Sequence, residues 1–263
     1  MIFPETPRII YSKNPLDEVI CQLRFPTILG IEKDIPYEFQ ESIRKDFPQY
    51  VEEEEFQIPL PGSSLENVPV ELFELAKNSI NRKNFSFLSE NSKWKINLTR
   101  DFISISTVDY TRWEVFRDYF TPALDNFIRI YKPAYYSRIG LRYRDVICKS
   151  SLNLSNEKWS ELLHPSIIGL LGDDDLENHV QEISSNTLLD LGDDSSKVKI
   201  QNGFILLKNE EKGFLIDSDF FSLNRTEIHD AMTKLDFFHE CASRLIRWSI
   251  TEKLHNTMEP KGL

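Results

Sequence analysis

Alternation of hydrophobic and polar residues predicts several β-strands in this chain. Residues 16–25 are the clearest case, because every second side chain is hydrophobic and successive side chains of a strand point to opposite faces. The hydrophobic positions are Val19, Cys21, Leu23 and Phe25. The same alternation over residues 94–98 and 103–105, with a turn at residues 99–101, predicts a hairpin. Further strands are expected at residues 180–190, 197–207 and 213–221.

Hydrophobic residues spaced three or four positions apart predict two long helices. The first follows Thr111, which forms a capping-box pattern with Glu114, and Pro133 ends it. Pro122 lies inside this helix and should kink or split it, because proline removes a backbone donor. The second long helix is expected over residues 224–255. Shorter helices are expected at residues 36–47, 70–80 and 157–163.

The order of these elements predicts an α+β fold. Residues 85–148 contain two strands, a helix and a third strand. Such units favour an antiparallel sheet with long amphipathic helices packed on one face. We expect one compact domain over residues 1–263, and a division into two lobes, 1–148 and 149–263, is the alternative.

Composition and charge narrow the class of protein. The chain is 40% hydrophobic and 28% charged, which is typical of a globular protein. Its net charge of −11 disfavours non-specific binding to nucleic acid, because phosphate contacts need a basic face. No hydrophobic run is long enough to cross a bilayer, and residues 1–8 do not resemble a signal peptide. We therefore expect a cytoplasmic protein with no membrane partner and no cofactor.

The strand over residues 136–144 carries the strongest candidate site. Its alternation places Arg138, Arg142 and Arg144 on one face, away from the hydrophobic side chains. Three guanidinium groups on one face require carboxylates or an anionic ligand to balance their charge. Arg24, on the predicted strand 16–25, could join the same surface and extend a site for a phosphate or carboxylate ligand.

Two acidic residues offer a structural explanation for the same arginines. Asp217 and Asp219 share one face of the predicted strand 213–221, so cross-strand pairing could neutralise the guanidinium groups. These two carboxylates could alternatively hold Mg²⁺, although no third carboxylate is placed nearby by the local sequence. We identify no catalytic motif, and we predict neither a catalytic residue nor a metal ligand. The candidate ligand-binding residues are Arg24, Arg138, Arg142, Arg144, Asp217 and Asp219.

Several segments together carry a family resemblance. They are Pro15–Val19 leading to Arg24-Phe25-Pro26, the stretch from Trp94 to Trp113, and Arg138–Tyr143, with residues 217–221 and the helix bearing His229 in the places expected near the C-terminus. These segments resemble an uncharacterised, sporadically distributed family of prokaryotic proteins of similar length. The resemblance implies no assigned activity and no catalytic residues. By association, a sporadic distribution implies a toxin–antitoxin or antiphage defence module.

Three hypotheses of function follow. The first is a non-enzymatic protein that binds a partner protein, as an accessory or neutralising component of a mobile defence or toxin–antitoxin locus. The acidic balance suits this role, because complementary charge speeds association with a basic partner. The second is a binder of a nucleotide or another phosphorylated ligand on the arginine-lined face. The third is a metal-dependent phosphodiesterase centred on Asp217 and Asp219.

Overall fold

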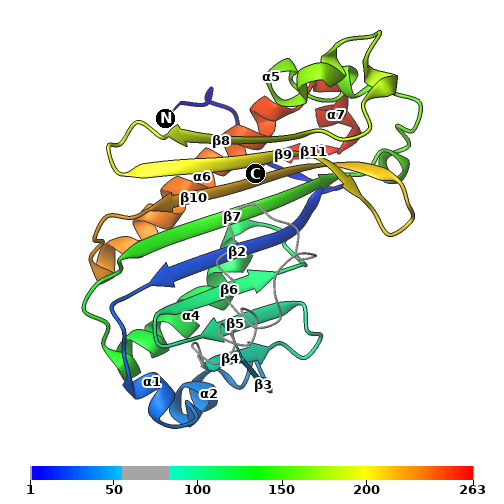
Figure 1. Ribbon diagram of the computed structural model, residues 1–263. Coiled ribbons are helices and arrows are strands. Elements are labelled where there is room, and N and C mark those ends of the chain that lie inside the picture. Colours follow the sequence, from blue (N-terminus) through cyan, green and yellow to red (C-terminus); the bar gives the residue numbers. More distant parts are fainter. Residues whose placement is uncertain (1, 55–82, 263) are drawn as a thin grey trace, which may run out of the picture.

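A large antiparallel sheet forms the centre of the molecule in a computed structural model that describes residues 2–54 and 83–262 (Figure 1). In the described part of the chain the sheet has nine strands. In spatial order they are β3 (Gln49–Glu54), β4 (Lys83–Leu88), β5 (Trp94–Leu98), β6 (Phe102–Thr107), β2 (Leu16–Arg24), β7 (Arg138–Ile147), β10 (Lys212–Ser222), β9 (Ser196–Leu206) and β8 (Ser184–Asp190). A separate pair joins β1 (Ile9–Tyr11) to β11 (Pro260–Gly262).

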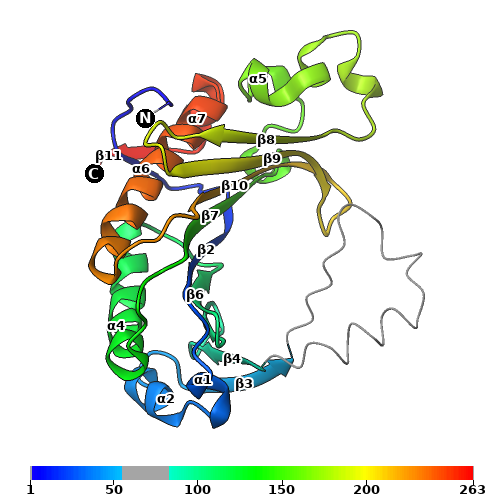
Figure 2. The ribbon, with the colours of Figure 1, turned by 60° about the vertical axis from the view of Figure 1, so that its left-hand side comes forward.

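Two long helices cover one face of this sheet. They are α4 (Trp113–Tyr131) and α6 (Ala231–Ser249), which lie on the same side of the strands in Figure 2. The shorter helices are α1 (Gly30–Lys33), α2 (Tyr37–Ile43), α5 (Pro165–Ile168) and α7 (Glu252–Thr257). Single 3₁₀ turns span Ser150–Leu152, Trp159–Glu161, Gly169–Gly172, Glu177–His179 and Ile228–Asp230. The predicted α+β class, with an antiparallel sheet and helices packed on it, is confirmed.

The main hydrophobic core lies between the sheet and the two long helices. Ile139 and Leu141 of β7 are fully buried there, as the alternation of the strand predicts. On α4, three phenylalanines at helical spacing face them and are also fully buried: Phe116, Phe120 and Phe127. Each such side chain contributes roughly 1.5–3 kcal/mol through removal of apolar surface from water.

A second hydrophobic cluster continues the core toward one end of the sheet. Ile147 of β7 and Phe214 of β10 supply its sheet side, and Trp159 and Leu254 lie among the helices and turns that cover them. Figure 1 shows α5 and α7 at this end. The central strands β7 and β10 therefore take part in both clusters, which extend along one face of the sheet.

The observed strands lie close to the positions that the sequence pattern predicts. The sheet contains strands from before and from after residue 148. Strands β2, β6 and β7 come before that position, and β8, β9 and β10 come after it. All six belong to the same hydrogen-bonded sheet, since β7 pairs with β2 on one side and with β10 on the other.

The N-terminus of α4 differs from the predicted capping box. The helix begins at Trp113, with Arg112 in the N-cap position and no side-chain cap hydrogen bond, so the assignment to Thr111 was wrong. The Glu114 carboxylate instead accepts a hydrogen bond from Arg8. Pro122 does not split the helix, which is continuous through it.

The predicted C-terminal helix over residues 224–255 is two helices, and the prediction of one was wrong. Ile250 has an extended backbone and forms an isolated bridge with Leu163, which ends α6. The Thr251 hydroxyl then accepts from the Leu254 amide and caps α7. Of the expected helix at 157–163 only a 3₁₀ turn forms. The helix expected at 70–80 lies outside the described residues.

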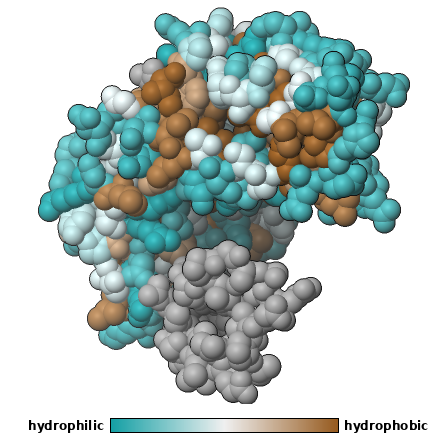
Figure 3. All heavy atoms as spheres, turned by 45° about the horizontal axis from the view of Figure 1, so that its top comes forward, coloured by the Kyte–Doolittle hydropathy of each residue, from teal (hydrophilic) through white to brown (hydrophobic). Residues whose placement is uncertain are grey.

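Figure 3 shows hydrophobic patches on this side of the molecule that are separated by hydrophilic surface. None of the helices in the described ranges is both long enough and sufficiently apolar to cross a membrane.

Candidate functional site

The six residues predicted as a ligand site come together on the sheet face opposite α4 and α6, which we call the polar face. Strand β7 supplies three of them between β2 and β10. The strand register places Arg24 opposite Arg138, Asp219 opposite Arg142 and Asp217 opposite Arg144. The alternation of β7 explains this grouping, because its other side chains are committed to the core.

Two of the arginines on the polar face are paired with the two aspartates. Arg142 donates from Nε to Oδ1 of Asp217 at 2.7 Å and from Nη2 to Oδ2 of the same carboxylate. Arg138 donates from Nη2 to both oxygens of Asp219, at 3.2 and 2.9 Å. The pairing hypothesis based on cross-strand geometry therefore describes the observed contacts, and these carboxylates occupy the donors that an anionic ligand would need.

Arg144 and Arg24 differ in their partners. Arg144 donates to the carboxylate of Asp17, at the start of β2. Arg24 donates through Nε to the neutral Gln22 at 3.0 Å, and Gln22 also accepts from Arg138 at 3.4 Å. Among the described residues, no carboxylate accepts a hydrogen bond from Arg24.

Gly140 makes room for the Arg138 guanidinium to lie across β7. A Cβ atom at position 140 would stand 2.2 Å from Nη1 of Arg138, far inside van der Waals contact. The absence of a side chain at Gly140 thus permits Arg138 to reach Asp219 on the next strand.

A metal site at Asp217 and Asp219 would need a third ligand, and none is found among the described residues. Residues 2–54 and 83–262 contain no group of three or more His, Cys, Asp or Glu side chains placed to hold a metal ion. The oxygens of both aspartates are instead engaged by arginine donors.

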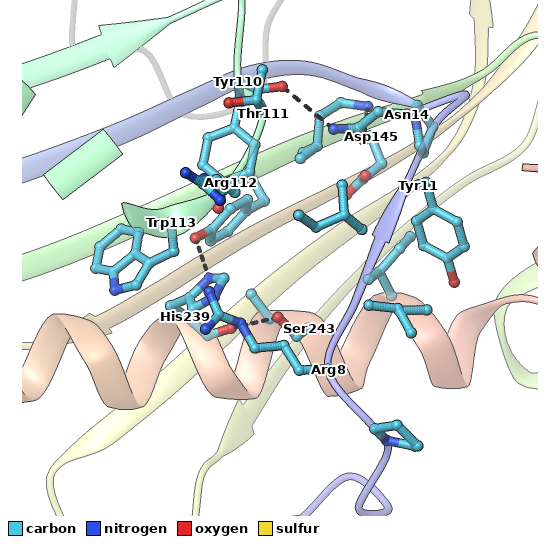
Figure 4. A pocket seen from close by; sticks show the side chains of 18 residues that line it. Arg8, Tyr11, Asn14, Tyr110, Thr111, Arg112, Trp113, Asp145, His239 and Ser243 are labelled. Atoms are coloured by element: carbon cyan, nitrogen blue, oxygen red, sulfur yellow. Dashed lines mark hydrogen bonds between the residues drawn. The ribbon is translucent and has the colours of Figure 1, made fainter. Parts of the chain in front are cut away.

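A pocket opens on the other face of the sheet, and the sequence analysis did not predict it. Its walls come from residues 7–16, from residues 110–113 before and at the start of α4, from β7 and from α6. Figure 4 shows Tyr11, Tyr110, Trp113 and His239 around this space. The volume, including the part open to solvent, is about 770 Å³. We call it the Asp145 pocket, after the carboxylate that enters it from β7.

Aromatic stacking fixes one wall of the Asp145 pocket. The His239 ring lies 4.9 Å from the Trp113 ring at an interplanar angle of 12°, and the Trp113 Nε1 donates to Asp236 at 2.7 Å. Nδ1 of His239 shares a hydrogen bond of 2.9 Å with the Tyr143 hydroxyl. Burial lowers the pKa of His239 to about 4, so the imidazole is neutral near pH 7.

The segment before β2 forms another wall and is tied down by polar contacts. Arg8 pairs with Glu114 at the N-terminus of α4. The Tyr11 hydroxyl shares a hydrogen bond of 2.8 Å with Nδ1 of His255 on α7, and Oδ1 of Asn14 accepts from the Leu16 amide at 3.1 Å. The pocket therefore depends on contacts between residues from both ends of the chain.

Asp145 is the exceptional group in the pocket. Only 5% of its surface is exposed, and no hydrogen bond or ion pair joins its carboxylate to another residue in the described parts of the chain. Figure 4 shows its side chain directed from the strand into the pocket. Burial raises the pKa of Asp145 to about 7, and the negative charge of Asp217 on β10 adds to the rise.

The alternation of β7 in the sequence already places Asp145 on the buried face of the strand. The core-facing positions of β7 are Ile139, Leu141, Tyr143, Asp145 and Ile147. A carboxylate therefore interrupts an otherwise hydrophobic series, between two buried residues. The alternation alone places it on the buried face, although it cannot show that a pocket lies there.

We expect Arg142→Ala to destabilise the protein by roughly 1–3 kcal/mol, because it leaves the Asp217 carboxylate, 8% exposed, without its donor. Arg144→Ala is the matched control on the same face of β7. Its partner Asp17 is 50% exposed, so we expect a loss below about 1 kcal/mol. Urea unfolding of both variants measures the difference, and equal losses would contradict it.

We expect Asp145→Asn to be more stable than the wild type at pH 8, by at most about 4 kcal/mol, and to lose this advantage as the pH falls toward 4. The reason is that the pKa of Asp145 rises from 3.8 to about 7 on folding. The stability of the wild type that comes from protonated Asp145 is therefore fully present below about pH 4, and it is lost as the pH rises through 7. Urea unfolding at pH 4.5, 6 and 8 tests this, and a difference that does not depend on pH would refute it.

Comparison of the sequence with protein-family models and with curated proteins gives no match.

Proposed function

We propose that this protein binds a small organic molecule and that the Asp145 pocket is its binding site. Ligand sites are concave, mostly apolar spaces with a few polar groups that fix the orientation of the ligand. The pocket fits this description, because tyrosine, tryptophan and aliphatic side chains line it together with the Asp145 carboxylate and the guanidinium groups of Arg8 and Arg112.

The unpaired carboxylate of Asp145 is the observation that carries this proposal. Burial of a carboxylate without a partner costs folding free energy, and native structures pair nearly all such groups. Asp145 lines the pocket, whereas Asp217 and Asp219 on the polar face have arginine partners. A ligand that donates to Asp145 would offset the cost of its burial.

This proposal keeps the non-enzymatic binding role predicted from the sequence and changes the expected ligand. The polar face offers less to a phosphorylated ligand, since Arg138, Arg142 and Arg144 are already paired with carboxylates. The partner protein and the defence or toxin–antitoxin locus remain proposals that rest on the family resemblance and on the net negative charge.

The experiment is a ligand-observed NMR screen of the purified protein against a fragment panel with equal numbers of cationic, neutral and anionic compounds. Each fragment that binds is tested again with Ser243→Phe. Ser243 is partly buried on α6 and lines the pocket, so the phenyl ring should fill the space and abolish binding.

Ser155→Phe makes the same substitution at an exposed position outside the pocket and should leave binding unchanged. Ala242→Leu, a smaller change in the same wall, serves if Ser243→Phe does not fold. The proposal fails if no fragment binds, or if the fragments bind equally well to the variants with a filled pocket.

A further inference from the structure

We propose that the ligand of the Asp145 pocket is an organic amine bound as its ammonium ion, with the charged group on Asp145 and an apolar body against the aromatic walls. This inference rests on the proposed function and adds the chemical class of the ligand.

The charges around the pocket point to a cation. Asp145 is the buried charged group of the pocket for which the described residues provide no partner. Arg112 also lines the pocket without an ion pair among the described residues, but it is exposed to solvent, which screens its charge. Arg8 and Glu114 neutralise each other where the N-terminal segment meets α4. His239 is neutral near pH 7 and bonded to Tyr143. A monocation therefore complements the site, whereas an anion would meet an uncompensated buried carboxylate.

The remaining lining indicates an organic cation in preference to a metal ion. A divalent metal needs several oxygen or nitrogen ligands, and within the described ranges no group of three such side chains surrounds Asp145. The walls instead contain the rings of Tyr11 and Tyr110 and the aliphatic side chains of Leu16 and Ile246. Aromatic rings attract an ammonium group electrostatically, and aliphatic groups bury the apolar part of the ligand.

Of the described residues that line the pocket, Asp145 is the one whose pKa lies between pH 5.5 and 8. Burial raises the pKa of Tyr11 to about 12 and also raises those of Tyr110 and Tyr143, so these phenols stay protonated. The pKa of His239 is lowered to about 4, so its ring stays neutral. The charged groups on the surrounding elements are Arg8, Arg112 and Glu114 near α4, Asp236 and Arg247 on α6, Glu252 on α7, and Asp217 on β10. His255 on α7, which bonds to Tyr11 outside the pocket lining, is also titratable, and burial lowers its pKa.

The experiment compares three compounds that share a phenyl ring with a two-carbon side chain: phenethylamine, 2-phenylethanol and phenylacetate. Their dissociation constants are measured by NMR titration of the wild type at pH 5.5 and pH 8. At pH 8 we expect the amine to bind at least about tenfold more tightly than the alcohol, since a hydrogen bond between two charged groups is stronger than one from a neutral donor. Phenylacetate should bind weakest.

The pH dependence gives a second measurement on the unmodified protein. Phenethylamine stays protonated up to about pH 9, so its affinity should rise severalfold from pH 5.5 to 8 as Asp145 ionises. A neutral ligand that accepts a hydrogen bond from protonated Asp145 would show the opposite trend. Tighter binding of the alcohol at pH 5.5 than of the amine at pH 8 would therefore overturn the inference.

Asp145→Asn should remove the preference for the amine while the alcohol still binds. Asp190→Asn is the matched control, because it removes a carboxylate at an exposed position of β8. If fragments bind the pocket and Ser243→Phe excludes them, but the amine has no advantage, the proposed function stands and the amine inference fails. If no compound binds the pocket, both fail.

Discussion

Strand β7 has hydrogen-bonded neighbours along both edges, so every one of its side chains must be accommodated on one of two faces. On the polar face the arginines are balanced by carboxylates from the adjacent strands. On the face covered by helices, the hydrophobic series is interrupted by Asp145. One layer of backbone separates the two faces, and the charge of Asp217 acts through it to raise the pKa of Asp145. Burial is the larger cause of that rise, and Arg142 binds Asp217 on the polar face.

In natural proteins the residues that depart from the usual rules of burial and pairing tend to lie at functional sites. In this chain the exception is local. Asp217 and Asp219 on the polar face have arginine donors. The three cysteines are free, two of them buried, and the helix surfaces follow the expected periodicity. Among residues 2–54 and 83–262, Asp145 combines near-complete burial with an unpaired carboxylate and access to a cavity. A binding role explains this combination, because a site that is poorly solvated and incompletely paired gains more from its ligand than a solvated one does.

The parts of the fold that depend on short-range patterns could be predicted from the sequence. Strands β2, β5 and β7 match their alternation, and the pairing of Arg142 with Asp217 follows from two strands that each place like charges on one face. Features that need distant contacts could not. The break at Ile250 depends on its bridge to Leu163, which helical periodicity does not contain. The pocket likewise requires the N-terminal segment to lie against α6, and no local pattern in either segment indicates that meeting.

The pairing of β1 with β11 has a consequence for the biosynthesis of the protein. Residues 9–11 are made early, but their strand partner at residues 260–262 and the pocket-lining turns of α6 leave the ribosome much later. The wall that α6 contributes to the Asp145 pocket therefore cannot form before residues 239–246 have been made, so the full burial of Asp145 requires a segment that is synthesised about a hundred residues after it.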